Sequence, residues 1–511
     1  MKKITAALLA TLLIISCVCL SGCGFIFDFL DELFYGNDYD PNAPSDHTHQ
    51  FDSYFTYSQC NVATCSVIGR KSSEGTFTKN FVYTLTASEI ARINGVYNQL
   101  LSHLNGDGDY AEFAELYSQY VDYYDYVVYQ YQVSSVLCDV ERTKANVNNY
   151  ASVVKQYNEM YSNYYGLYEL IYNSNLRSEF YKGWTDDEIS QALYYAEIYG
   201  GTADNNNAVD EILTEYDDYI ESIGGRISTT QQLNVIGEMY GRLVEANNNV
   251  AIAAHYDNYL DYAYAHEYNR DYAPSDVAET MRDYVKRYVA PIFVKVAMRS
   301  QALAKVSFNS TADRDFYYAM LSDSLFTAPS NKSFSRAKTA VNYVGEYFNY
   351  MQQSALDTGG QKFDFGSAVE DLFRDGNYFT GDYEGAYTWW IRKVNSPIVY
   401  FGSDYDTAFT FVHEFGHYYE NVYNGSLTLS YDHNETHSQG NEMLFLAWLA
   451  QHKSSSVSNG FDMVEIEQLF DMLGNIVIAT AVDEFEQAAY TGTYNGQPIT
   501  VSYSEAWLDG R

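Results

Sequence analysis

The stretch TAFTFVHEFGHYY, residues 407–419, decides how the rest of the sequence is interpreted. Apolar and aromatic side chains recur in it at the i, i+3, i+4, i+7 spacing of a helix: Ala408, Phe411, Val412, Phe415 and Tyr419. The stretch therefore predicts an amphipathic helix whose apolar face packs on a core. His413 and His417 are four residues apart, so their side chains project next to each other from a neighbouring face.

Two imidazoles at this spacing can reach one zinc ion at about 2.0–2.1 Å each. Glu414 is turned by about 100° from His413, so it lies outside the ligand set but within reach of a metal-bound water. A carboxylate in that place can act as a general base in hydrolysis. Because ordinary helices can also carry two surface histidines at this spacing, the motif alone does not settle the chemistry.

A third ligand is needed, and its identity separates classes of zinc site. The metzincin pattern would place glycine and histidine where this chain has Glu420 and Tyr423, so that class is excluded. Glu442 is the favoured third ligand, because eight apolar residues (443–450) follow it and a carboxylate heading a buried helix is costly unless it is paired or binds a metal. Two histidines and one glutamate leave a position open for water, as in catalytic sites. Rival ligands lie on a polar stretch interpreted as a loop: His433, Glu435 and His437.

The motif HEFGH (413–417) followed by Glu442 resembles the thimet-oligopeptidase and oligoendopeptidase F family of zinc metallopeptidases. Residues 385–387, 396–401 and 255–291 are also similar to that family, and the resemblance covers roughly residues 75–511. It implies a mainly α, two-lobed helical zincin-type fold, with a small edge β-sheet beside the zinc helix and a deep substrate channel. It also implies one Zn²⁺ per chain and hydrolysis of short peptides. The family continues past the point that corresponds to Arg511, so we expect a C-terminally incomplete catalytic domain and a poor catalyst.

The segment 396–402 precedes the metal motif and is rich in β-forming residues. Its Pro397 is typical of the start of an edge strand. We expect this strand to line the channel and to pair with the substrate backbone, because an unpaired edge offers amides and carbonyls to an extended peptide. The predicted substrate-binding residues are Val399, Tyr400, Phe401 and Gly402, and an ordinary edge strand without a ligand is the alternative.

The N-terminus carries a targeting signal. Lys2 and Lys3 precede an apolar run, and Leu20-Ser21-Gly22-Cys23 resembles the bacterial lipobox. We expect cleavage before Cys23, lipidation of that residue, and a protein exported and anchored by lipid to the outer face of the bacterial cytoplasmic membrane. A plain signal peptide or an N-terminal membrane helix is the alternative.

The predicted organisation follows from this signal and from helix patterns. It comprises a signal peptide (1–22), a tether (23–55), an N-terminal helical lobe (56–200) and a catalytic zinc-peptidase domain (201–511). Capping boxes are predicted at three helix starts: Thr86 with Glu89, Thr185 with Glu188, and Ser228 with Gln231.

Charge and cysteines limit the possible partners. The net charge of −37 becomes −39 when residues 1–22, with two lysines and no acids, are removed, which disfavours binding to nucleic acid or to anionic lipid. Cys60 and Cys65 could form a disulfide, and Cys138 is expected to be buried and free. The oligomeric state is not indicated by the sequence.

Three functions fit these features. The leading one is a zinc-dependent metalloendopeptidase of short peptides, anchored at the cell surface. The second is a catalytically impaired, zinc-containing peptide-binding lipoprotein. The third is a surface protein whose zinc only joins helices, and Glu414 argues against it because a structural zinc needs no base beside it.

Overall fold

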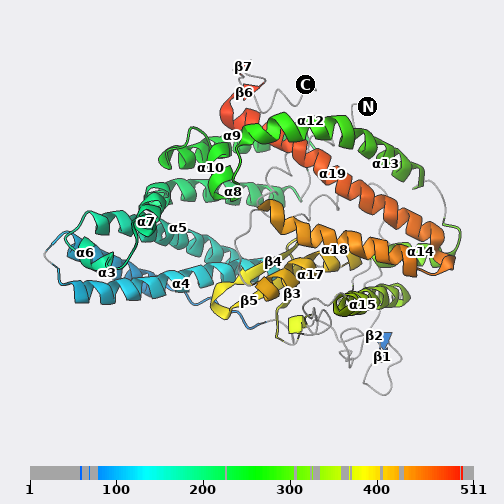
Figure 1. The fold of residues 1–511 in the computed structure, drawn as a ribbon, viewed down its shortest axis with the longest axis horizontal. Coiled ribbons are helices and arrows are strands. Elements are labelled where there is room, and N and C mark those ends of the chain that lie inside the picture. The colour runs from blue at the N-terminus through cyan, green and yellow to red at the C-terminus, as the bar shows by residue number, and fades with distance from the viewer. Residues whose placement is uncertain are drawn as a thin grey trace.

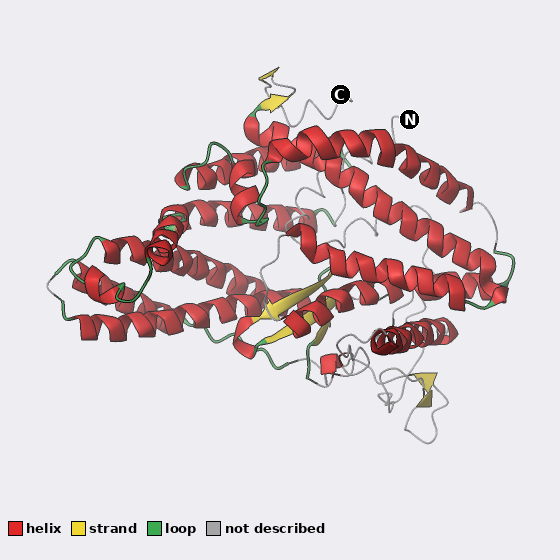
Figure 2. Ribbon diagram, viewed as in Figure 1, coloured by secondary structure: helices red, strands yellow, loops and turns green. Residues whose placement is uncertain are grey.

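The computed structural model describes residues 58–59, 68–69, 79–106, 108–224, 227–303, 308–322, 325, 334–357, 368, 371–373, 375–402, 407–424, 431–494 and 497–498. Within these residues the protein is mainly helical, with a three-stranded sheet and two minimal two-stranded ones (Figures 1 and 2). The predicted mainly α class with a small sheet is confirmed.

The N-terminal helices form one arm of the molecule, at the left of Figure 1. They are preceded by the short strands β1 (Ser58–Gln59) and β2 (Ile68–Gly69) and comprise α3 (Ala87–Leu104), α4 (Tyr110–Val140), α5 (Lys144–Tyr172), α6 (Arg177–Phe180) and α7 (Asp186–Tyr199). Side-chain caps start the longer ones, and the predicted capping boxes at Thr86 and Thr185 are confirmed. The third box begins one residue later than predicted, at Thr229 with Gln232. Buried leucine, valine and phenylalanine side chains, with partly buried tyrosines around them, make the core of this arm.

The next helices share a second core. They are α8 (Ala203–Ser222), α9 (Thr230–Ala253) and α10 (Tyr259–His266), followed by a continuous helical segment made of α11 (Pro274–Asp276), the π-helix η1 (Val277–Met281), α12 (Arg282–Tyr284), the π-helix η2 (Val285–Val289) and α13 (Ala290–Leu303). The segment from η1 to α13 runs along the outer side of the long helix α19 (Ser458–Thr491) (Figure 1).

The third and largest core surrounds the metal motif. It is built from α14 (Thr311–Leu321), α15 (Phe334–Asp357), β3 (Tyr378–Gly381), β4 (Ala386–Ile391), β5 (Ser396–Gly402), α17 (Ala408–Asn424), α18 (Tyr431–His452) and the first half of α19. Short elements complete the described chain: the 3-10 helices η3 (Arg392–Val394) and η4 (Ser455–Val457), and the strands β6 (Thr493–Tyr494) and β7 (Gln497–Pro498).

The sheet corrects one sequence-based prediction. Its order is β3-β5-β4, so β5 is the central strand, parallel to β3 and antiparallel to β4. Val399, Tyr400, Phe401 and Gly402 are therefore paired on both sides and buried, and they cannot pair with a peptide. The edge-strand prediction rested on Pro397, but a proline is also compatible with this central strand. On the β3 side, Pro397 precedes Val399, the first β5 residue that pairs with β3. On the β4 side, Pro397 and Trp390 are a pair of opposite residues that exchange no hydrogen bonds. The missing N–H of Pro397 therefore removes no hydrogen bond from the sheet.

Helix α4 joins the N-terminal arm to this sheet. The carbonyl oxygen of Asp139 accepts hydrogen bonds from the Tyr400 hydroxyl (2.9 Å) and from the Tyr383 amide (3.0 Å). The Asp139 carboxylate accepts one from the Tyr387 hydroxyl (2.8 Å). Gly381 makes the close approach possible, because a Cβ there would lie 2.2 Å from the Cα of Val140.

This junction predicts a pH dependence of stability. Burial, only partly offset by the Tyr387 hydrogen bond, raises the pKa of Asp139 from 3.8 to about 7. The folded protein therefore keeps the Asp139 proton between about pH 4 and 7 while the unfolded chain loses it, so this residue's contribution to stability is full below pH 4 and lost as pH rises to 7. An Asp139→Asn variant should gain stability relative to wild type over that range, by up to about 4 kcal/mol at 1.4 kcal/mol per pKa unit. Urea unfolding of both proteins from pH 4 to 8 measures it, and a pH-independent difference would contradict it.

Other predictions for the chain ends stay open. The predicted signal segment, Cys23, Cys60 and Cys65 lie outside the described residues, and Cys138 is buried and unpaired in α4 as predicted. The predicted lobe boundary at residue 200 falls between α7 and α8. None of the helices in the described ranges combines the length and apolar character needed to cross a bilayer.

Candidate metal centre

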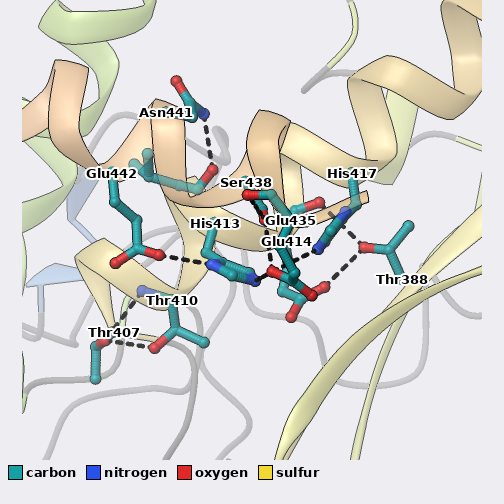
Figure 3. A network of polar contacts seen from close by, with 11 residues as sticks. Thr388, Thr407, Thr410, His413, Glu414, His417, Glu435, Ser438, Asn441 and Glu442 are labelled. Atoms are coloured by element: carbon teal, nitrogen blue, oxygen red, sulfur yellow. Dashed lines mark hydrogen bonds and ion pairs between the residues drawn. The ribbon is translucent and has the colours of Figure 1, made fainter. Parts of the chain in front are cut away.

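Helix α17 presents the two motif histidines as predicted. Its apolar face is buried against the sheet and α15, with Phe411, Val412 and Phe415 at most 1 % exposed. His413 and His417 lie side by side, with ring centroids 5.1 Å apart. Figure 3 shows both rings facing α18.

The third group beside these rings is Glu435. Its Oε2 lies 3.4 Å from Nε2 of His413 and 3.8 Å from Nε2 of His417, and these three side chains form the one described group of possible metal ligands that lies within 4.8 Å. Ligands held at about 2.0–2.1 Å around a tetrahedral zinc ion are themselves roughly 3.4 Å apart. The two nitrogens and the oxygen therefore fit a zinc ion closely in number, chemistry and spacing.

Glu442 contacts the other nitrogen of the His413 ring. Its Oε1 lies 2.6 Å from Nδ1 of His413, on the side of the ring opposite to Glu435 (Figure 3). In this geometry the carboxylate that lies near both Nε2 atoms is that of Glu435, one of the rival ligands, while Glu442 contacts Nδ1 of His413. The assignment of Glu442 as third ligand stays a prediction, and the distances favour Glu435 in that role. A carboxylate on the second nitrogen of a ligating histidine fixes its tautomer and increases its basicity.

The stretch with the rival ligands is also not a loop. It forms the first turns of α18, in which His433 and His437 are exposed and stand outside the group. Glu435 and Glu442 are seven residues, or two turns, apart and so lie on the same face of α18. Both carboxylates reach His413 for this reason, one on each ring nitrogen.

Carboxylates dominate the electrostatics of the site. Burial lowers the pKa of His413. The hydrogen bond with Glu442 and the nearby charges of Glu414 and Glu435 outweigh burial and raise this pKa to about 9. Burial, followed by the charge of His413, lowers the pKa of His417 to about 4. Three carboxylates around two imidazoles thus favour a cation between them.

Glu414 is buried behind the histidines, 4 % exposed. Burial raises its pKa to about 7, while the charge of His413 and the hydrogen bond of Thr388 act in the opposite direction. The Thr388 hydroxyl lies 2.9 Å from Oε2 of Glu414 and 3.0 Å from its main-chain oxygen. Sequence reasoning missed Thr388. Its only signal in the sequence is its place directly after residues 385–387, and the structure puts it on β4, facing α17.

Close packing of α17 and α18 sets the spacing of the ligands. A Cβ on Gly416 would lie 2.9 Å from the Cα of Ser438 and 3.0 Å from the carbonyl oxygen of His437. Asn441 donates from Nδ2 to the carbonyl of Val412 (2.8 Å). Ser438 donates from its hydroxyl to Oε2 of Glu435 (2.9 Å), which holds the carboxylate toward the histidines.

Gly416→Ala is therefore expected to weaken zinc binding at least about tenfold, in the range seen when groups that orient metal ligands are lost. The added methyl group must push α18, and Glu435 with it, away from the imidazoles. Gly440→Ala is the matched control, since a Cβ at that helical position meets no atom within 4 Å. Zinc titration with a competing chromophoric chelator compares the two variants. Equal affinities would show that the close approach at Gly416 does not set the site.

A second contact holds the start of α18 from outside. Arg270 donates to both carboxylate oxygens of Asp432 at 2.7–3.2 Å, and the Tyr272 hydroxyl donates to the same group at 2.5 Å. The Arg270 guanidinium lies over the ring of Tyr264, 4.4 Å from its centroid. The turn that carries Glu435 is thus tied to the α10–α11 connection.

Comparison with solved structures shows which known proteins share this fold. No protein-family model matches the sequence, and no curated protein matches it. A crystal structure of a protein described as an oligoendopeptidase F, from Bacillus anthracis str. Ames, is similar with a TM-score of 0.57 and 14 % identity, covering 86 % of this chain and 84 % of that chain. A second structure, also described as an oligoendopeptidase F, is similar with a TM-score of 0.54 and 15 % identity, covering 84 % and 81 %. At these identities the likeness shows a shared fold.

Proposed function

We propose that the protein is a zinc-dependent metallopeptidase. The observation that carries the proposal is the convergence of His413 Nε2, His417 Nε2 and Glu435 Oε2 beside the buried carboxylate of Glu414. Within that class we assign it to the oligoendopeptidase F type, which acts on short peptides. The shared fold over most of the chain and the HEFGH motif support this assignment.

Zinc, when bound, supplies a Lewis acid that lowers the pKa of water and polarises a carbonyl group. Glu414 has the properties of the general base. Thr388 holds its Oε2, which leaves Oε1 to accept a proton. A pKa of about 7 lets the same carboxyl take up a proton and pass it to the leaving amine near neutral pH.

The strand that offers its edge to a peptide is β4. Gly402 donates from its amide to the carbonyl of Gly385, so every second residue from Gly385 faces β5, and Ala386 and Thr388 point their backbone groups the other way. No strand in the described part of the chain pairs with that outer edge. We propose that an extended peptide pairs there, because Thr388 then brings the peptide next to Glu414.

The location of the protein is also proposed from the sequence. We expect export and lipid attachment at Cys23, on the outer face of the cytoplasmic membrane, because of the lipobox-like segment 20–23. A Cys23→Ala variant should run unprocessed or leave the membrane fraction when expressed in a bacterial host. Wild-type protein found free in the medium would contradict the anchor.

A peptide mixture tests the proposed activity. The purified chain is loaded with zinc, incubated with a library of short peptides and with a folded protein, and the products are read by mass spectrometry. Cleavage of the peptides only, stopped by a chelator and restored by added zinc, is the expected result. Peptide binding without cleavage would instead support the impaired peptide-binding lipoprotein. Cleavage that no chelator affects would exclude a zinc peptidase.

A further inference from the structure

The helical segment 277–303, from η1 to α13, carries an unusual concentration of exposed apolar side chains. Six large hydrophobic residues on it are 50–67 % exposed: Met281, Tyr284, Tyr288, Ile292, Val294 and Met298. The ten other exposed large hydrophobic residues in the described chain are spread over the remaining elements. Large exposed apolar patches mark binding surfaces in soluble proteins, whereas scattered single residues do not.

These side chains form two neighbouring rows on the solvent side of the segment. Met281, Tyr284, Tyr288 and Ile292 are three or four residues apart, and Val294 and Met298 are four apart in a second row. The opposite side packs on α19, where Phe293 stacks on Phe470 with centroids 5.2 Å apart and Arg282 pairs with Asp483 at 2.6 Å. Figure 1 shows the segment at the outer rim of the molecule, beyond α19.

The same segment is basic in a strongly acidic protein. It holds five cations and two acids, a net charge of +3, while the whole chain has −37: Arg282, Lys286, Arg287, Lys295 and Arg299 against Glu279 and Asp283. Arg282 and Lys286 pair with acids of α19, and Arg287 pairs with Asp283 of the same segment. Lys295 and Arg299 are exposed and have no ion-pair partner among the described residues.

We propose that this face binds the surface of an anionic lipid bilayer. An apolar stripe flanked by lysine and arginine is the composition of a helix that lies in the membrane interface, with its apolar side chains at the boundary of headgroups and acyl chains. Tyrosine favours that depth, and the Tyr284 and Tyr288 rings are adjacent, 5.0 Å apart. Charge complementarity selects the lipid over a second copy, because a symmetric dimer through this face would bring its cations together.

The net charge does not prevent this contact. Charges are screened beyond about 8 Å at physiological ionic strength, so the acidic remainder of the molecule acts weakly on a membrane that touches the basic face. The local charge thus reverses the expectation drawn from the whole composition. The patch lies away from the metal centre, and the inference does not depend on the proposed peptidase function.

Vesicle co-sedimentation tests the proposal with the full chain carrying Cys23→Ala, so that no attached lipid contributes. Vesicles are of phosphatidylcholine alone or with about 30 % phosphatidylglycerol. Residues 1–22, which also carry lysines and an apolar run, are identical in every protein, so the difference between the patch variants and their parent reports the patch. Binding to the anionic vesicles is expected to be at least about tenfold tighter, given about 1 kcal/mol for each cation near the surface.

Two variants and a control locate the effect. Lys295→Glu/Arg299→Glu and Tyr284→Ser/Tyr288→Ser/Met298→Ser are each expected to lower binding at least about tenfold, and high salt should weaken the contact. Lys144→Glu/Lys155→Glu is the matched control, with the same charge change at exposed positions of α5, and should bind as the parent does. Equal binding to both vesicle types, or equal loss in the control, would overturn the proposal. A dimer that the patch variants dissociate, without lipid binding, would overturn it in favour of a second copy.

Discussion

Glu414→Gln is expected to keep one zinc ion per chain while lowering kcat/KM for a peptide substrate by about 10²–10⁴-fold, the usual contribution of a general base. Glutamine retains the shape of the side chain and can still accept the Thr388 hydrogen bond, but it cannot take up a proton at neutral pH. The three ligand atoms belong to other residues, so the metal should stay. Metal analysis and steady-state kinetics on the same preparation measure both quantities.

The control for this variant is Glu238→Gln, the same chemical change at an exposed position of α9 and outside the ligand group. It is expected to leave zinc content and kcat/KM within about twofold of wild type, because a surface substitution away from the site usually changes free energies by less than 0.5 kcal/mol. Unchanged turnover in Glu414→Gln, or loss of its zinc, would remove Glu414 from the role of base.

The second large effect separates the two glutamates of α18. Glu435→Ala is expected to abolish stoichiometric zinc binding, because the site then keeps only two protein ligands. Glu442→Gln is expected to keep zinc with an affinity lowered about 10–100-fold, as for other groups that orient a ligating histidine. Zinc retained by Glu435→Ala and lost from Glu442→Gln would restore Glu442 as the ligand.

Thermal unfolding distinguishes the loss of a zinc ligand from a folding defect in these two variants. A ligand that binds only the folded state raises stability as its concentration exceeds its Kd. Added zinc should therefore raise the Tm of wild type and of Glu442→Gln, and it should leave the Tm of Glu435→Ala unchanged. Both variants should show wild-type helical content by circular dichroism before zinc is added.

The sequence predicted the part of the site that one helix determines. His413, Glu414 and His417 follow from a local motif with helical spacing, and the structure places them as expected. The choice between Glu435 and Glu442 depends on where helix α18 begins and on its axial position relative to α17. The buried residues after Glu442 indicate a carboxylate that needs a partner, and either a metal ion or a buried histidine can be that partner.

Tertiary pairing explains the error in the predicted edge strand. A run of apolar residues from Pro397 to Phe401 is also typical of a central strand buried on both faces, and only the register shows that β3 begins to pair beyond the proline. Thr388 and the basic face of segment 277–303 were missed for a related reason. The role of a hydroxyl on a strand, or of a local charge in an acidic chain, depends on residues that are distant in the sequence and adjacent in the fold.

Anomalous diffraction at the zinc absorption edge, from crystals of the zinc-loaded protein, tests the central claim most directly. One peak is expected per chain, about 2.0–2.2 Å from Nε2 of His413, Nε2 of His417 and a carboxylate oxygen of Glu435, with Glu442 on the far side of the His413 ring. A peak coordinated by Glu442 in place of Glu435, or no peak between the two histidines, would contradict the account.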